Sequence, residues 1–199
     1  MTSLKSDGRK NIEKLRLVEE LHAPAKRNFF RRHVIVRGYD DLWQADIVEM
    51  RPYSRFNRGH HYILTVTDVL SKYAWAVPLK NKGGSETADA IAEIIRDSKR
   101  YPKNMQTDMG KEFRRNIDVQ RLMRKHDINH YSTYSMLKAS IVERFNRTLK
   151  NDMWKMFTLN GTYNGLTRCR DSCRITTRAS IERLVCNPSM LSPRSLKDS

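Results

Sequence analysis

The sequence predicts an α/β or α+β domain with five strands. Segments rich in β-forming residues come first, and strand-like and helix-like segments then alternate along the chain. A chain of 199 residues is long enough to bury most of the surface that its unfolded form exposes. The expected order of elements is β-β-β-α-β-α-β-α, in one domain with an extension at each end.

The first 33 residues are polar and charged, and apolar residues at helical spacing predict a short helix that ends before Pro24. The segment from Lys26 to Arg37 that follows is basic and includes Phe29 and Phe30. It suits a solvated linker and a DNA-contacting arm about equally.

The predicted domain begins with three strands, and the short Leu70-Ser71-Lys72 connection between the second and third suits a hairpin. A helix then follows Ser85 and Glu86, because apolar residues recur there at a spacing of three and four. The predicted strands are 42–48, 62–69, 73–78, 104–108 and 128–132, and the later predicted helices are 117–126 and 139–157, the last one preceded by a loop at 134–137.

The charge balance makes a polyanion the expected partner, since 38 Lys and Arg residues outnumber 22 Asp and Glu residues and the net charge is +16. Nucleic acid is favoured over an acidic membrane surface because the basic residues are interleaved with aromatic residues. A soluble basic protein of another kind is the alternative. No segment has the length and apolar character of a membrane span, so no membrane partner is expected.

The three cysteines do not indicate a zinc site. Cys169, Cys173 and Cys186 lack the spacing of zinc ligands and have no nearby Cys/His pair. Disulfides are not expected either.

Three acidic residues stand out in this basic chain, because each lies where a strand ends or a helix begins. Asp46 closes an apolar and aromatic run, Asp108 precedes Met-Gly and so a sharp turn, and Glu143 opens a basic helix. Their spacing along the chain fits one acid for each β/α unit. Each could instead be an ordinary strand-end, turn or helix-dipole carboxylate. Asp68 is an alternative for the first position, but its place on the second strand indicates a structural role.

The segments DLWQADIVEM, TDMGKEF and KASIVERFNRTLK resemble the acidic motifs of the retroviral-type integrase and DDE transposase catalytic core. The nearest resemblance is to integrases of Maverick/Polinton-type transposons and of retroelements. It implies a ribonuclease-H-like α/β fold, a mixed five-stranded sheet with flanking helices. It also implies three parts: a basic N-terminal extension (1–34), an integrase catalytic core (35–163) and an irregular tail (164–199).

The resemblance implies that Asp46, Asp108 and Glu143 are the catalytic residues and the ligands of two Mg²⁺ or Mn²⁺ ions, with Asp46 bridging them. Such a site would process DNA 3′ ends and join them to target DNA. The resemblance further implies DNA as the partner, a homo-oligomer when active, and action in the nucleus. The alternatives are a decayed or domesticated nucleic-acid-binding fragment without catalysis, and a nuclease that cuts RNA in hybrids.

A basic helix face is expected to contact the DNA backbone, since Glu143 and three further residues recur on it at i, i+3, i+4 and i+7. A flanking loop and the turn after Asp108 would extend this track. The predicted DNA-binding residues are Lys111, Lys138, Ser140, Asn146, Arg147 and Lys150. Phe145 and Leu149, on the same helix, are expected to face the core.

The tail departs from the resembled family, whose members continue with a further helix. The segment after Tyr163 has little helical periodicity, and a back-translation shifted by two bases recovers a sequence like that helix. A shifted reading frame from about Asn164 and an in-frame, lineage-specific tail are the two interpretations. We expect no packed element there, because a sequence read in a shifted frame is not selected to pack.

Overall fold

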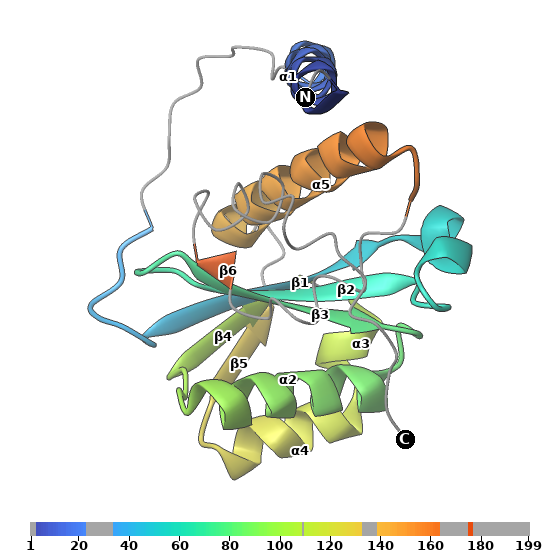
Figure 1. Cartoon of the computed structure of the whole chain (residues 1–199). Helices are drawn as coiled ribbons and strands as arrows, with labels where there is room; N and C mark the ends of the chain where they lie inside the picture. Colours follow the sequence, from blue (N-terminus) through green and yellow to red (C-terminus); the bar gives the residue numbers. More distant parts are fainter. Residues whose placement is uncertain (1–2, 23–33, 109, 133–138, 164–174, 177–199) are drawn as a thin grey trace, which may run out of the picture.

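The structure is a computed structural model that describes residues 3–22, 34–108, 110–132, 139–163 and 175–176. Its centre is a mixed sheet with the strand order β5-β4-β1-β2-β3-β6 (Figure 1). The first three strands form an antiparallel meander, and β4 and β5 continue the sheet in parallel beyond β1. The strands are β1 (Leu42–Glu49), β2 (Tyr62–Asp68), β3 (Tyr73–Leu79), β4 (Asn104–Thr107), β5 (Asn129–Ser132) and β6 (Ile175–Thr176).

The five predicted strands and the mixed sheet are confirmed. The two-residue strand β6 was not predicted. It lies inside the segment expected to be an irregular tail, and it pairs with the start of β3. The rest of that tail, residues 164–174 and 177–199, and the basic segment 23–33 lie outside the described residues.

Helices cover both faces of the sheet (Figure 1). Three of them lie on one face, and a long helix lies on the other with the N-terminal helix packed against it. The helices are α1 (Ser3–Leu21), α2 (Gly84–Ser98), α3 (Lys111–Arg114), α4 (Ile117–Lys125), α5 (Ser140–Asn160) and the 3-10 helix η1 (Arg51–Phe56). The four predicted helices are confirmed, whereas η1 and α3 were not predicted because each is too short to show helical periodicity.

None of the helices in the described part of the chain has both the length and the apolar character needed to cross a membrane.

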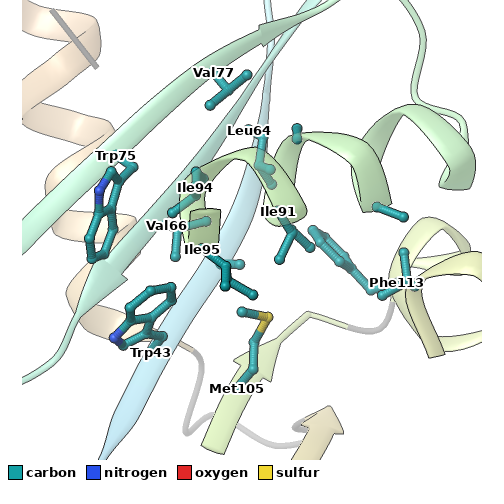
Figure 2. Close-up of a cluster of buried hydrophobic side chains, with 14 of the residues drawn as sticks. Trp43, Leu64, Val66, Trp75, Val77, Ile91, Ile94, Ile95, Met105 and Phe113 are labelled. Atoms are coloured by element: carbon teal, nitrogen blue, oxygen red, sulfur yellow. The ribbon is translucent and has the colours of Figure 1, made fainter. Parts of the chain in front are cut away.

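The larger core lies between the sheet and α2. Trp43 of β1 and Met105 of β4 pack against Ile95 of α2, and Trp75 stacks 4.5 Å from Trp43 (Figure 2). Because side chains alternate along a strand, the neighbours of Trp43 in β1 face the opposite way, toward α5. β1 therefore divides its residues between an apolar face under α2 and a partly polar face under α5.

A smaller core fixes α5 on the second face. Leu149, Met153 and Phe157 of α5 are buried together with Val48 and Ile63 of the sheet. Phe145 packs at the edge of the same cluster, so the expectation that Phe145 and Leu149 face the core is confirmed. α1 adds a layer outside α5, where Val18 is buried and His22 Nε2 lies 3.1 Å from Thr158 Oγ1.

A buried ion cluster closes the other end of the sheet. Asp68 is fully buried, and its Oδ2 lies 2.6 Å from Arg100 Nη2, which also lies 2.6 Å from Asp40. The Arg100 guanidinium further lies 5.3 Å from the Trp75 ring. Asp68 pairs with Trp43 across the β1–β2 ladder and so shares its α2-facing side, away from Asp46. The structural role expected for Asp68 is confirmed.

Replacing Arg100 with leucine should lower the free energy of unfolding by about 3 kcal/mol, because the Asp68 carboxylate would then be buried without its cation. This is the low end of the range for buried pairs, since the Arg100 side chain keeps part of its surface in water. The matched control is Arg96→Leu on the exposed side of α2, which should change stability by less than about 0.5 kcal/mol. Equal urea midpoints for the two variants would show that the cluster contributes nothing.

Candidate active site

The parallel pairing of β1 and β4 brings two of the predicted catalytic acids together. The ladder runs through Gln44 opposite Gln106 and Ala45 opposite Thr107. The next residues along the chain are Asp46, within β1, and Asp108, directly after the end of β4. In a parallel pair, residues in register point to the same face, so both carboxylates face α5 at the carboxyl end of β4. The carboxyl ends of parallel strands are the usual place for ligands in α/β sheets.

Asp46 is held in place from two sides. Its Oδ1 accepts a hydrogen bond from the Ile47 backbone N–H at 2.8 Å, and its Oδ2 accepts one from Asn146 Nδ2 at 2.7 Å. The second bond joins the sheet to the second turn of α5. The carboxylate is therefore oriented without any ion pair to a cation among the described residues.

Asp108 sits at the start of a tight turn, where its Oδ1 accepts a hydrogen bond from the Gly110 N–H at 3.0 Å. Partial desolvation raises the pKa of its carboxyl above the ordinary value, and the negative charges of Asp46 and Glu112 raise it further. The Gly110 bond and the Lys82 ammonium act in the opposite direction. Asp108 thus lies in a group of like charges that disfavours its ionised form.

An ion pair next to Asp108, between the buried Glu112 and Lys82, was not predicted from the sequence. Glu112 is only 7% exposed, and its Oε1 lies 2.7 Å from Lys82 Nζ, which comes from the connection between β3 and α2. This bond to Glu112 is the main reason why the pKa of Lys82 is raised. A Cβ at Gly110 would stand 2.4 Å from Glu112 Oε1, so any other residue at that turn would require the Glu112 carboxylate to shift. The detectable signal was a second acid, Glu112, inside the motif that contains Asp108.

The N-terminus of α5 is capped by the sheet. Gln44 is 1% exposed, and its Oε1 accepts hydrogen bonds from the backbone N–H groups of Ile141 (2.9 Å) and Val142 (3.1 Å). Its Nε2 donates to Gln106 Oε1 at 2.9 Å. The residue at the helix start, Ala139, has no side chain able to cap. Gln44 thereby fixes where α5 begins relative to Asp46.

Glu143 lies in the first turn of α5 and is exposed. Asn146, one turn later on a neighbouring side of the helix, is 6% exposed and bonded to Asp46. The sequence placed Asn146 on a DNA-contacting face, but the structure buries it and gives it a positioning role for Asp46. Its Oδ1 has no hydrogen-bond partner among the described residues.

The other predicted DNA-binding residues fall into two groups. Arg147 and Lys150 are exposed on α5, and Ser140 is half-buried at its first position. Lys111 begins α3, but its side chain lies outside the described part of the structure, as does the whole of Lys138. The described part of the basic face therefore consists of Arg147 and Lys150, beside the turn that carries Glu143.

Two of the three predicted ligands fit a hard divalent cation. Asp46 and Asp108 offer carboxylate oxygens, and the unpaired, buried Oδ1 of Asn146 is a further oxygen donor beside Asp46. Glu143 does not join them: across the described residues, no three Asp, Glu, His or Cys side chains gather closely enough to hold a metal ion. Asp46 and Asp108 are thus the residues that could hold a cation here, and Glu143 lies one helical turn from Asn146.

Replacing Asp108 with asparagine should stabilise the metal-free protein at pH 7. The raised pKa means that the ionised form of Asp108 is disfavoured in the folded state, so its charge costs stability at any pH above that raised pKa. The parent should accordingly gain stability as the pH falls through this pKa, and Asp108→Asn should not share that gain. Thermal melts from pH 4 to 8 in EDTA measure both effects. The control is Asp89→Asn on the exposed face of α2. A lower melting temperature for Asp108→Asn at pH 7 would contradict the like-charge description.

Comparison with known proteins agrees with this geometry. The profile of the integrase core domain family matches residues 37–134, a range that includes Asp46 and Asp108 and ends before Glu143. The chain is 36% identical over 109 residues to the transposon-derived protein F54H12.3 of Caenorhabditis elegans, covering 55% of this chain and 38% of that protein. It is 29% identical over 116 residues to the Pol polyprotein of Feline endogenous virus ECE1, covering 57% of this chain and 11% of the polyprotein. The chain thus spans only a minor part of both relatives.

Solved structures share the fold. The HTLV-2 integrase catalytic core domain, determined in complex with magnesium in a dimeric form, superposes with a TM-score of 0.55 at 19% identity, over 73% of this chain and 86% of that one. A chain of the simian T-cell lymphotropic virus intasome in complex with PP2A regulatory subunit B56 gamma superposes with a TM-score of 0.58 at 21% identity, over 88% of this chain and 65% of that one. Residues 37–134 thus match the integrase core domain family, and the chain has the ribonuclease-H-like fold of retroviral integrase catalytic cores.

Proposed function

We propose that this chain is the catalytic core of a mobile-element integrase, which processes DNA 3′ ends and joins them to target DNA. The observation that carries the proposal is the β1–β4 register, which sets Asp46 beside Asp108 within the segment that matches integrase core domains. An origin in a Maverick/Polinton-type transposon or a retroelement is part of the proposal, supported by the likeness to a transposon-derived protein and a Pol polyprotein.

Asp46 and Asp108 would hold a divalent cation, Mg²⁺ or Mn²⁺, and Glu143 would complete the set of ligands for a pair of ions. Such ions, when bound, activate the attacking oxygen and stabilise the leaving one. In end processing the attacking oxygen belongs to water. In joining, the 3′ oxygen of a DNA end bonds to a target phosphorus while the bond from that phosphorus to its own 3′ oxygen breaks. The number of phosphodiester bonds is therefore unchanged.

The chain's own residues would keep the acids and the DNA in place. Asn146 orients Asp46 through its 2.7 Å hydrogen bond, and Gln44 fixes the start of α5. Arg147 and Lys150, exposed on α5, would neutralise DNA phosphates next to the acids. We propose DNA as the substrate, a homo-oligomer as the active form and the nucleus as the place of action.

A nucleic-acid-binding fragment without catalysis is the second candidate. One observation favours it: Glu143 is exposed and stands outside any three-acid group in the described structure. The two candidates make opposite predictions for strand transfer by the parent chain.

Asp46→Asn, Asp108→Asn and Glu143→Gln should each reduce Mg²⁺- or Mn²⁺-dependent strand transfer to background, because each removes a ligand charge. Folding should survive, since Asp108 and Glu143 are exposed and the amide oxygen introduced by Asp46→Asn could still accept the Asn146 bond. Transfer of a labelled duplex end into plasmid DNA measures the activity, and Asp89→Asn is the matched acid-to-amide control. A single variant that joins DNA at the parent rate would remove that residue from the site, and an inert parent would favour the second candidate.

Arg147→Ala combined with Lys150→Ala should flatten the salt dependence of duplex binding by about 2 units of d log K/d log[salt], because each phosphate neutralised on duplex DNA contributes about 0.9. Fluorescence anisotropy between about 50 and 200 mM salt gives this slope. Arg121→Ala with Arg124→Ala, both exposed on α4 at the other face of the sheet, is the control. If both double variants keep the parent slope, the α5 face does not bind the DNA backbone.

A further inference from the structure

The connection between β1 and β2 forms a surface that the proposed reaction does not use. Its 3-10 helix η1 and the end of α5 enclose a cavity of about 430 Å³. The cavity is lined by Tyr53, Trp154, Phe157, Thr158, Gly161 and Tyr163. Four of these six residues are aromatic, so the cavity offers flat apolar faces. We call this cavity together with Arg55, Phe56 and Arg58 the η1 surface.

The η1 surface is preformed by hydrogen bonds and ring contacts. Asn57 is fully buried, and its Nδ2 donates to the backbone oxygens of Tyr53 (2.7 Å) and Tyr163 (3.0 Å). The Tyr53 ring lies 5.3 Å from Trp154 and 4.9 Å from Tyr163. One buried amide thus ties η1 to the segment that follows α5, and little ordering would be needed on binding.

Two aromatic rings at the rim are exposed together. Phe56 is 50% exposed and Tyr163 is 46% exposed, and their ring centroids are 5.4 Å apart. Neighbouring exposed rings leave apolar area in water that a flat ligand could cover. Since Tyr163 contacts both Phe56 and the cavity wall, the rim and the cavity form one continuous aromatic surface.

The charges around these rings favour an anionic ligand. Arg55 and Arg58 are exposed on the same connection, and in the described structure neither has a carboxylate within ion-pair distance. Arg51, by contrast, pairs with Glu49 at 3.1 Å and bonds to the Tyr62 hydroxyl at 2.7 Å. The cations next to the exposed rings are thus the two that the protein does not neutralise.

We propose that the η1 surface binds an unpaired stretch of DNA, with bases stacked on the aromatic rings and phosphates on Arg55 and Arg58. Aromatic platforms interleaved with cations are the usual means of binding single strands, because every base has a stacking face. An intact duplex hides those faces, and an apolar protein segment would leave the two arginines without partners. The inference rests on the proposed function only in taking DNA as the substrate.

The position of the η1 surface suits a strand that also reaches the acids. β1 leads from Asp46 to the start of η1, and the four residues to Met50 span about 13 Å. α5 covers a similar length, since Asn146 at Asp46 and Trp154 at the cavity are eight residues and therefore about 12 Å apart. Two independent elements thus place the η1 surface about 12 to 13 Å from Asp46 on the α5 side of the sheet.

The test compares three DNA probes on the unmodified full chain in EDTA: an oligothymidylate of about 12 nucleotides, an abasic strand of equal length and a duplex. The oligothymidylate should bind about tenfold more tightly than the abasic strand, which has the phosphates but no bases to stack. It should also quench tryptophan fluorescence through Trp154, because Trp43 and Trp75 are buried in the other core.

Two variants test which residues of the η1 surface bind the single strand. Phe56→Ala should lose most of the preference for the oligothymidylate over the abasic strand while keeping duplex affinity. Arg55→Ala with Arg58→Ala should flatten the salt slope for the single strand by about 1.4 units, at about 0.7 per phosphate. Arg121→Ala with Arg124→Ala on α4 is the matched control and should keep the parent slope.

Equal affinity for the oligothymidylate and the abasic strand would overturn the proposal, and this comparison needs no variant to fold. An unchanged preference in a folded Phe56→Ala protein would overturn it as well. The assay contains no divalent metal and no joining step, so a parent that is inert in strand transfer but prefers the oligothymidylate contradicts only the proposed catalysis. A parent that joins DNA without that preference contradicts only the η1 proposal.

Discussion

The parallel pairing of β1 with β4 is the constraint on which the rest of the site depends. In one register it sets Gln44 opposite Gln106 and, two positions on, Asp46 beside Asp108. The first pair hydrogen-bonds side chain to side chain, and Gln44 then caps α5. A shift of β4 by one residue would turn Gln106 and Asp108 to the α2 face, where the apolar core has no partners for them. The acids and the helix above them are thus positioned by the same register.

The two faces of the sheet carry carboxylates in two different electrostatic environments. On the α2 face, Asp68 is buried but neutralised by Arg100, so its charge supports the fold. On the α5 face, the negative charge of Asp46 is one of the causes that raise the pKa of the Asp108 carboxyl, and among the described residues neither acid has a cation at ion-pair distance. Lys82, the cation that acts on Asp108, is already bonded to Glu112. The protein therefore keeps a local excess of negative charge, and a bound cation could relieve it.

The sequence predicted the elements with strong patterns and missed those determined by tertiary contacts. The three meander strands are rich in β-formers and α2 has a clear apolar period, so their positions were predictable. The capping role of Gln44 was not, since glutamine in a strand carries no sign of which helix it will meet. Asn146 was misplaced for a similar reason: helical spacing puts it near Glu143, but only the β1–α5 contact shows that it is buried against Asp46. The Lys82–Glu112 pair joins the β3–α2 connection to α3, and although Glu112 stands in the motif of Asp108, nothing in the sequence indicates that Lys82 is its partner.

The exposed position of Glu143 is consistent with the same electrostatics. Three carboxylates near 4 Å would repel one another by up to about 4 kcal/mol for each pair at an effective dielectric constant of about 20. Without a cation this cost opposes bringing Glu143 to Asp46 and Asp108. The rest of α5 is fixed by Leu149, Met153 and Phe157, whereas its first turn is held by the Gln44 side chain and has no side-chain cap of its own. Under the proposed function, a movement of that first turn would bring the third acid to the other two once a cation offsets their repulsion.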